Sequence, residues 1–309
     1  MCYNKKYFDM RNFTFKGLFL AAMFMVLGSL AIQAADDDGL ITKQIIVKLE
    51  KAGTLPDRIG STKRNKITNL KIIGEINGTD WRVIRYMSDR DTGGKLAILD
   101  LSEAKIVRGG DYYYDDYEEF YTHDNELGTH AFYGCRGLTS LTLPSGLTSI
   151  GSWAFTGCSG LTSLSLPSGL TSIGVGAFSG CSGLTSLSLS SGLTSIGDVA
   201  FSGCSGLTSI YVYTEKLPNT GSNVFDGCDA KKCTVYIPKG TYDDYWLSEF
   251  GYFENIVEFD PTGINNVITS NDAKELSRYS LNGQRLSAPT NGLNIVKYSD
   301  GSVKKVVVQ

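Results

Sequence analysis

Apolar residues recur along the middle of the chain in a pattern that repeats every 23 residues. Three almost identical copies begin at Leu138, Leu161 and Leu184, and a diverging fourth begins at Leu207. The first, fourth and sixth positions of each copy are apolar, which places the last two on one face of a β-strand. A fixed period of this length is typical of a solenoid, in which stacked coils bury a shared core.

The rest of each copy predicts the return path of the coil. In the first copy, a turn at residues 144–146 is followed by the apolar pair Leu147 and Ile150. We expect a short turn of helix at Ala154 and Phe155 that ends at Gly157. One phenylalanine per copy is expected to fill the core opposite the leucines (Phe132, Phe155, Phe178, Phe201 and Phe225).

The same spacing continues beyond the regular copies. It recurs in two sets on the N-terminal side (Ile67, Leu70, Ile72 and Leu96, Leu99, Leu101). Val235 and Ile237 fit a last strand whose first apolar site has become Lys232. We therefore expect an α+β repeat protein with about seven coils, whose strands start near residues 67, 96, 138, 161, 184, 207 and 232. The alternative for residues 40–110 is a separate small domain.

The strand pattern L-x-x-L-x-L is that of a leucine-rich repeat. The whole unit, L-T-S-L-x-L-P-S-G-L-T-S-I-G-x-x-A-F-x-G-C-S-G, resembles the BspA-like leucine-rich repeat family of bacterial surface proteins over residues 131–238. The resemblance implies a leucine-rich repeat solenoid and a surface-exposed protein used in adhesion or recognition, without catalysis.

The two ends of the chain predict export. Residues 1–34 read as a signal peptide: basic residues precede an apolar run from Leu18 to Ile32, and small residues follow at Ala34 and Ala35. Met10 is an alternative start. We expect no transmembrane helix after this segment is removed. The organisation we expect is irregular coils over 40–130, regular repeats with a C-terminal cap over 131–260, and a small β module over 261–309.

Three turn dipeptides predict hairpins in the last segment, at residues 282–283, 291–292 and 300–301. The expected strands lie near residues 278–281, 293–298 and 303–308. The segment YSLNGQRLSAPTNGLNIVKYSDGSVKKVVVQ resembles the C-terminal sorting domains of the Por (type IX) secretion route. That resemblance implies contact with secretion machinery and an outer-membrane or extracellular location. A β module that only caps the solenoid is the alternative.

Charge and motifs count against several function classes. The net charge of −3 gives no basic surface for nucleic acid. The sequence contains no G-x-S-x-G, H-E-x-x-H, P-loop or G-x-G-x-x-G motif, so we expect no enzyme and no cofactor.

Five cysteines follow the repeat (Cys135, Cys158, Cys181, Cys204 and Cys228). Equivalent residues of adjacent coils lie about 4.8 Å apart, whereas the Cβ atoms of a disulfide lie about 3.8 Å apart. We therefore expect a ladder of free, buried thiols, and leave open a bridge between Cys228 and Cys233. With only two histidines, His123 and His130, and no C-x-x-C, we expect no metal site.

The exposed side of each strand offers the candidate binding surface. Its residues are mostly serine and threonine in the regular copies and become aromatic towards the C-terminal end, at Tyr211, Tyr213 and Tyr236. Tyrosine supplies large contact area, so we expect these three rings to dominate binding. The alternative is that serine and threonine serve only solubility and strand propensity.

An insertion over residues 111–126 mixes tyrosines with acidic residues and interrupts the coil spacing. Its candidate contact residues are Tyr112, Tyr113, Tyr114 and Tyr117. An equally weighted alternative is that these rings lie back on the flank of the solenoid. The function we expect is recognition or adhesion through a protein partner. The alternatives are a glycan-binding module and a structural spacer, with an enzyme ranked last.

Overall fold

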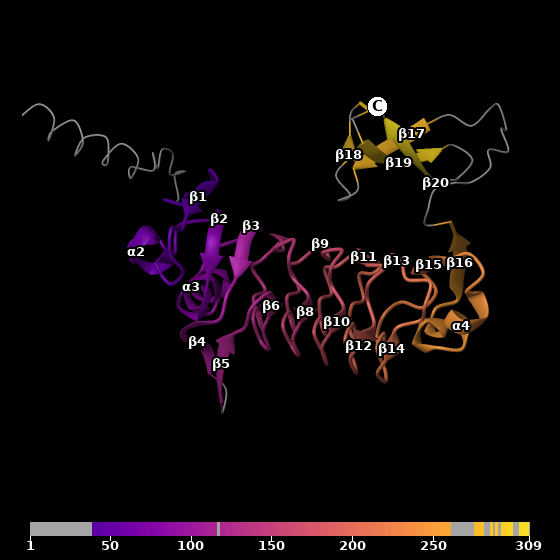
Figure 1. The fold of residues 1–309 in the computed structure, drawn as a ribbon, viewed down its shortest axis with the longest axis horizontal. Helices are drawn as coiled ribbons and strands as arrows, with labels where there is room; N and C mark the ends of the chain where they lie inside the picture. Colours follow the sequence, from indigo (N-terminus) through magenta and orange to yellow (C-terminus); the bar gives the residue numbers. More distant parts are fainter. Residues whose placement is uncertain are drawn as a thin grey trace, which may run out of the picture.

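The fold is an elongated stack of coils built around one long parallel sheet (Figure 1). The computed structural model describes residues 39–115, 118–260, 275–280, 285–286, 288–289, 292–298 and 303–308. The predicted signal peptide, the alternative start at Met10 and Tyr117 lie outside the described residues. Within them, no helix is long and apolar enough to cross a membrane.

The long sheet has nine strands in the order β1-β2-β3-β7-β9-β11-β13-β15-β16, and every neighbouring pair is parallel. The strands are β1 (Ile45–Lys48), β2 (Asn69–Ile76), β3 (Ile98–Ile106), β7 (Ser140–Thr142), β9 (Ser163–Ser165), β11 (Ser186–Leu189), β13 (Ser209–Val212), β15 (Thr234–Pro238) and β16 (Asn255–Phe259). The leucine-rich repeat solenoid is confirmed, and β2 and β3 belong to the same sheet as the regular coils.

Our expectation of about seven strands in this sheet was too low, because β1 and β16 break the spacing rule. The buried positions of the first coil are Ile41, which forms an isolated bridge ahead of β1, and Ile45 and Val47 within β1, so one extra residue separates the first two. In β16 the residue opposite buried Ile237 is the exposed Glu258. A terminal strand has a neighbour on one side only, so its sequence is free to depart from the pattern.

A second parallel sheet runs along the solenoid, made of two-residue strands. Its order is β14-β12-β10-β8-β6, with bounds β6 (Glu126–Leu127), β8 (Ser149–Ile150), β10 (Ser172–Ile173), β12 (Ser195–Ile196) and β14 (Asn219–Thr220). The isoleucine of the predicted second apolar pair is buried here, as in Ile150 and Ile173.

The expected turn of helix after this strand is wrong, because its backbone bonds to the next coil. The amide of Phe155 donates to the carbonyl of Ala177 at 2.7 Å, and the amide of Gly157 donates to Ser179 at 2.8 Å. The amides of Thr156 and Cys158 donate along the chain instead, each to the carbonyl three residues earlier, so the two kinds of bond alternate and no continuous helix forms. The segment is therefore a series of turns held in register by its neighbours.

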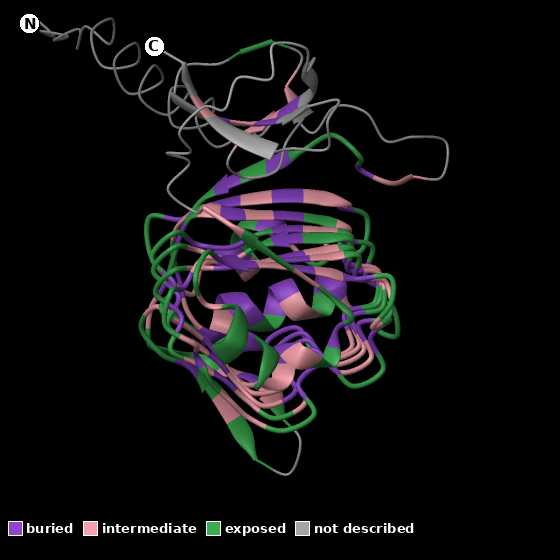
Figure 2. Cartoon of the chain, turned by 90° about the vertical axis from the view of Figure 1, so that its right-hand side faces the viewer, coloured by how far each residue is buried: buried purple, intermediate pink, exposed green. Residues whose placement is uncertain are grey.

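The phenylalanine ladder is confirmed as the spine of the core. Successive rings stack with centroids 5.4, 4.9, 5.1 and 5.8 Å apart and with interplanar angles of 12° or less (Phe132, Phe155, Phe178, Phe201 and Phe225). All five side chains are almost fully buried. Figure 2, which looks along the stack, shows buried residues on the inside of the coils.

The threonine that follows the first leucine of each copy links one coil to the next. Its amide and hydroxyl both donate to the carbonyl of the equivalent residue in the preceding coil, as Thr185 does to Thr162 at 3.2 Å each and Thr208 to Thr185 at 2.9 and 3.0 Å. The repeated threonine thus satisfies backbone carbonyls along the stack, beyond the solubility expected from sequence.

The cysteine ladder consists of free, buried thiols, as expected, and Cys228 and Cys233 are not bridged. Each thiol from Cys158 onward donates to the phenylalanine carbonyl of the preceding coil, with distances of 3.0 Å at Cys158, 3.1 Å at Cys181 and 3.2 Å at Cys204. Burial raises the pKa of Cys181 from 9.0 to about 12. The thiols are therefore neutral groups that help to join the coils.

The raised thiol pKa values predict that the protein loses stability in alkali. Burial also raises the pKa of Cys135 and Cys233 to about 12, while in the unfolded chain a thiol ionises near 9.0. Between those two values the folded state binds more protons than the unfolded state, so the free energy of unfolding falls as pH rises. We expect full stability below about pH 8.5 and a steady loss above it, measured by urea unfolding.

A double variant Cys135→Ala and Cys181→Ala is the control for this effect. It should show a shallower loss of stability with pH than the parent, because two of the buried ionisable groups are gone. An unchanged slope would show that other groups cause the alkaline loss.

Two helices close the N-terminal end: α2 (Leu55–Ile59) and α3 (Gly78–Ser88). Asn77 and Asp80 form a capping box at the start of α3. Asp80 is fully buried, and its carboxylate also accepts bonds from the amides of Gly53 at 2.6 Å and Leu55 at 2.8 Å. One side chain therefore ties α2 and its preceding loop to α3.

Two positions in each regular coil have a left-handed backbone. One is always glycine (Gly134, Gly157, Gly180, Gly203 and Gly227), whereas the residue at the other varies (His130, Trp153, Gly176, Val199 and Asn223). At Val199, φ is 48°, a conformation that β-branched residues adopt at a cost of roughly 1–2 kcal/mol. Asn223 occupies the equivalent position of the next coil with φ 56°. Asparagine tolerates this backbone better than valine does.

We expect Val199→Asn to raise the free energy of unfolding by about 1 kcal/mol, measured by chemical denaturation. The matched control is the reverse change, Asn223→Val at φ 56°, in the equivalent position of the next coil. That variant should be clearly destabilised. Similar stability of the two variants would refute the backbone explanation.

At the C-terminal end of the solenoid lie α4 (Tyr242–Trp246) and the 3-10 helix η1 (Glu249–Tyr252). Beyond them is a separate antiparallel sheet in the order β18-β17-β19-β20, formed by β17 (Glu275–Ser280), β18 (Arg285–Leu286), β19 (Gly292–Tyr298) and β20 (Val303–Val308). The expected small β module is confirmed, with β19 and β20 at the expected positions.

β18 was not among the expected strands, and it does not form a hairpin with β19 across the turn expected at residues 291–292. β17 lies between them in the sheet and pairs with both, so the chain crosses from one side of β17 to the other. The dipeptides expected to form the turns lie at least partly outside the described residues. A turn signal cannot distinguish a hairpin from such a crossing, because both need a change of chain direction.

Candidate binding surface

The exposed side of the nine-stranded sheet has the arrangement that the sequence predicts. Residues of neighbouring strands lie opposite one another in two rows. One row contains Lys71, Asp100, Thr142, Ser165, Ser188, Tyr211 and Tyr236. The other contains Asn69, Ile98, Ser140, Ser163, Ser186, Ser209 and Thr234. We call this surface the strand face.

The strand face changes in chemistry along its length. Near β2 and β3, the ammonium of Lys71 forms ion pairs with Asp100 at 3.2 Å and Glu103 at 2.7 Å. The middle carries small hydroxyl side chains. Towards β13 and β15 it becomes aromatic.

Tyr211 and Tyr236 form one stacked pair on the strand face. Their ring centroids are 4.6 Å apart and their planes are inclined by 6°. Burial raises the pKa of Tyr211 from 10.0 to about 12, with smaller contributions from the neighbouring tyrosines, including Tyr279 of β17. Tyr211 is therefore a neutral group that can donate a hydrogen bond over the physiological pH range.

Tyr213 lies beside this pair at the end of β13. Its ring contacts Phe259 of β16 edge to face, at a centroid distance of 5.5 Å. Val257 lies opposite Tyr236 on β16, and its side chain is 45% exposed. We call Tyr211, Tyr213, Tyr236, Val257 and Phe259 the strand-face aromatic patch. The residues on β16 were not found from sequence, because that strand was not expected.

The tyrosine-rich insertion is a hairpin of β4 (Gly109–Asp115) and β5 (Glu119–Thr122). Tyr113 is buried, and its hydroxyl donates to the carbonyl of Thr129 at 2.6 Å. The guanidinium of Arg82 lies 4.9 Å from the Tyr112 ring, and that of Arg85 lies 4.2 Å from the Tyr114 ring.

These contacts place Tyr112, Tyr113 and Tyr114 against α3 and the adjacent coil. Tyr114 also packs near the rings of His130 and Tyr133, with centroids 5.0 and 6.0 Å away. Tyr113 is thus a structural residue, which corrects its choice as a contact residue. The arrangement of all three rings matches the alternative in which they lie back on the solenoid flank.

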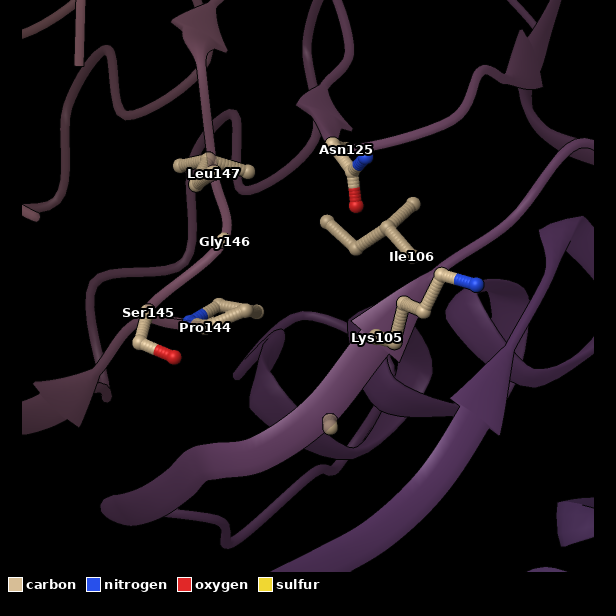
Figure 3. A pocket seen from close by; sticks show the side chains of 8 residues that line it. Lys105, Ile106, Asn125, Pro144, Ser145, Gly146 and Leu147 are labelled. Atoms are coloured by element: carbon tan, nitrogen blue, oxygen red, sulfur yellow. The ribbon is translucent and has the colours of Figure 1, made fainter. Parts of the chain in front are cut away.

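No group of histidine, cysteine and acidic side chains among the described residues could hold a metal ion. One pocket, of about 220 Å³, lies where the irregular coils meet the first regular coil. Figure 3 shows Lys105, Ile106 and Asn125 on one side and residues 144–147 on the other. This volume is below the roughly 300–1,000 Å³ of small-molecule sites.

Comparison with known proteins places the repeats in a family. Residues 125–245 match, in six copies, the family model described as the BspA type leucine rich repeat region. That part of the chain is therefore a run of BspA-type leucine-rich repeats. No curated protein matches the chain.

Three solved structures are similar to parts of this chain. A leucine-rich repeat protein from Bacteroides ovatus is 21% identical and covers 71% of this chain and 66% of its own, with a TM-score of 0.34. The pneumococcal vaccine antigen PcpA is 15% identical; the match covers 73% of this chain and 61% of the antigen, with a TM-score of 0.37. A leucine rich cell surface protein from Faecalibacterium prausnitzii is 18% identical; the match covers 61% of this chain and 51% of that protein, with a TM-score of 0.24. The chain spans less than two thirds of the length of each.

Proposed function

We propose that this chain is an exported, non-catalytic recognition or adhesion protein that binds a protein partner through the strand-face aromatic patch. The observation that supports this most strongly is the stacked pair of Tyr211 and Tyr236 on an otherwise hydroxyl-rich face. Aromatic rings at a surface bury large apolar area and still offer a hydroxyl to a partner.

The geometry of the pair favours a protein over a glycan. A sugar ring stacks on the flat face of an aromatic ring, whereas Tyr211 and Tyr236 cover one face of each other at 4.6 Å. The other face of each ring borders the residue opposite on the next strand, Ser188 for Tyr211 and Val257 for Tyr236. The edges and hydroxyls are therefore the parts offered to a partner, and these suit a protein surface with apolar side chains and backbone carbonyls. A glycan ligand remains the competing outcome of the test below.

We expect the double variant Tyr211→Ser and Tyr236→Ser to lose at least about tenfold in affinity for a partner recovered from host matrix proteins. The matched control is Ser165→Ala with Ser188→Ala, on the same face, which should bind as the parent does. Both variants are first checked by thermal melting, and affinity is measured by surface plasmon resonance. A glycan array run in parallel tests the competing ligand class.

Equal binding by parent and double variant, with both folded, would move the binding surface elsewhere. Tyrosine-dependent binding to a glycan, with none to any protein, would replace the protein ligand by a carbohydrate. Absence of any ligand in both screens would favour the spacer.

Export is supported by the basic, apolar and small-residue order of residues 5–35. We propose that the C-terminal module serves as a sorting domain of the Por (type IX) route, as its sequence resemblance implies. A chain truncated before residue 275 should then accumulate in the periplasm of a bacterium that has this route. Its appearance on the cell surface would refute the sorting role.

A further inference from the structure

The outer surface of the C-terminal end of the solenoid exposes large apolar side chains. Around α4 and η1, Tyr242 is 41% exposed, Trp246 48%, Leu247 85% and Tyr252 42%. A terminal coil of a solenoid ordinarily presents a polar outer face, because no further coil covers it. Exposed apolar groups gathered in one place mark an interaction surface.

Tyr242, Trp246 and Leu247 are not among the residues that close the core. Tyr252 also has a structural contact, because its hydroxyl donates to the carbonyl of Cys228 at 2.9 Å. The same segment buries Tyr245, Phe250 and Phe253, and the last two pack against Phe225 with centroids 5.1 and 5.0 Å away. The hydroxyl of Tyr245 donates to the carbonyl of Thr214 at 2.9 Å. The inner side of the cap therefore completes the phenylalanine ladder, and the outer side is left for another role.

The chemistry of this surface is acidic as well as aromatic. Residues 240–260 contain no lysine, arginine or histidine and six carboxylates (Asp243, Asp244, Glu249, Glu254, Glu258 and Asp260). Glu258 accepts bonds from the amides of Gly240 and Tyr242, and Glu249 accepts one from Val224. Asp243 and Asp244 are exposed on α4 and lie between Tyr242 and Trp246 in the sequence.

A hollow lies beside Tyr242. It has a volume of about 320 Å³ and is lined by Gly240, Tyr242, Asp243, Asp244 and Glu258. The rings of Tyr242 and Trp246 are nearly parallel, at 9°, with centroids 6.1 Å apart. Carboxylates and aromatic rings together attract a cation, through charge and through the negative face of each ring.

We propose that this cap surface, formed by Tyr242, Asp243, Asp244, Trp246, Leu247 and Tyr252, binds a basic segment of a partner protein. An arginine or lysine of the partner occupies the hollow, and a neighbouring apolar residue packs on Leu247 and Trp246. The cap surface shares no residue with the strand-face aromatic patch. The binding proposals for the two surfaces can therefore be tested, and refuted, independently.

The test uses the full-length protein and two labelled peptides, one of alternating arginine and leucine and one of alternating glutamate and leucine. Fluorescence anisotropy should show binding of the arginine peptide only, weakening as salt is added. The pair Asp243→Asn and Asp244→Asn should weaken that binding by about tenfold, and so should Leu247→Ser alone.

The matched control is Asp57→Asn with Asp91→Asn, which removes the same charge from exposed sites at the N-terminal end. It should bind the arginine peptide as the parent does. Equal weakening by both pairs, or equal binding of both peptides, would overturn the proposal. A dimer of the protein alone that Trp246→Ala abolishes would also overturn it, since the occupant would then be a second copy.

Discussion

Replacing Leu187 by alanine is expected to lower the free energy of unfolding by about 2–5 kcal/mol. Leu187 is fully buried and lies opposite Ile210 in the next strand of the sheet. Stacked coils on both sides leave little room for the site to collapse, so the cavity adds to the lost burial. Urea unfolding followed by circular dichroism measures the change.

Ser188→Ala is the matched control, one residue along the same strand and on its exposed side. Removing its hydroxyl should change stability by no more than about 0.5 kcal/mol. Comparable losses of stability for the two variants would mean that Leu187 does not face the core as assigned. The strand face and the binding surface built on it would then be misassigned.

Replacing Asp80 by alanine is expected to cost at least about 3 kcal/mol at the N-terminal end of the solenoid. The carboxylate accepts backbone bonds from Gly53, Leu55 and Asn77, at 2.6, 2.8 and 3.0 Å. Its removal leaves those amides without their acceptor, and each unsatisfied buried donor costs roughly 1–3 kcal/mol. Because each coil contacts only its neighbours, the damage should be local.

Hydrogen exchange tests both the size and the place of this effect. The amides of Gly53 and Leu55 should exchange much faster in Asp80→Ala, while those of β11 and β13 keep their protection. Asp91→Ala, an exposed aspartate in the loop after α3, is the control and should leave all of them unchanged. Uniform loss of protection along the chain would contradict local closure by Asp80.

The regular coils could be predicted because each copy repeats the same requirement. Leu187 and its equivalents must face a core that every coil shares, and the phenylalanine ladder follows from the same period. The strand face was predictable for the same reason, since side chains alternate along a strand. The pairing of Tyr211 with Tyr236 needed only the strand spacing in addition.

The ends of the solenoid were harder, because their contacts join residues that no period relates. Asn77 and Asp80 have the spacing of a capping box, yet the bonds from Gly53 and Leu55 to Asp80 depend on how the chain returns to α3. The tyrosines of the insertion carried no signal of which side they face. The hydroxyl of Tyr113 can be buried because it donates a hydrogen bond to the carbonyl of Thr129, a residue of the adjacent coil.

The sequence by itself determined the solenoid, its phenylalanine and cysteine ladders, and which side of each regular strand faces the core. These features depend on local spacing that recurs in every coil. Only the tertiary structure decided how the ends are closed, that the segment after the second strand bonds between coils, and which aromatic residues remain exposed. Those outcomes depend on partners far along the chain, and a side chain such as Trp246 is exposed only because Tyr245, Phe250 and Phe253 already cover the core.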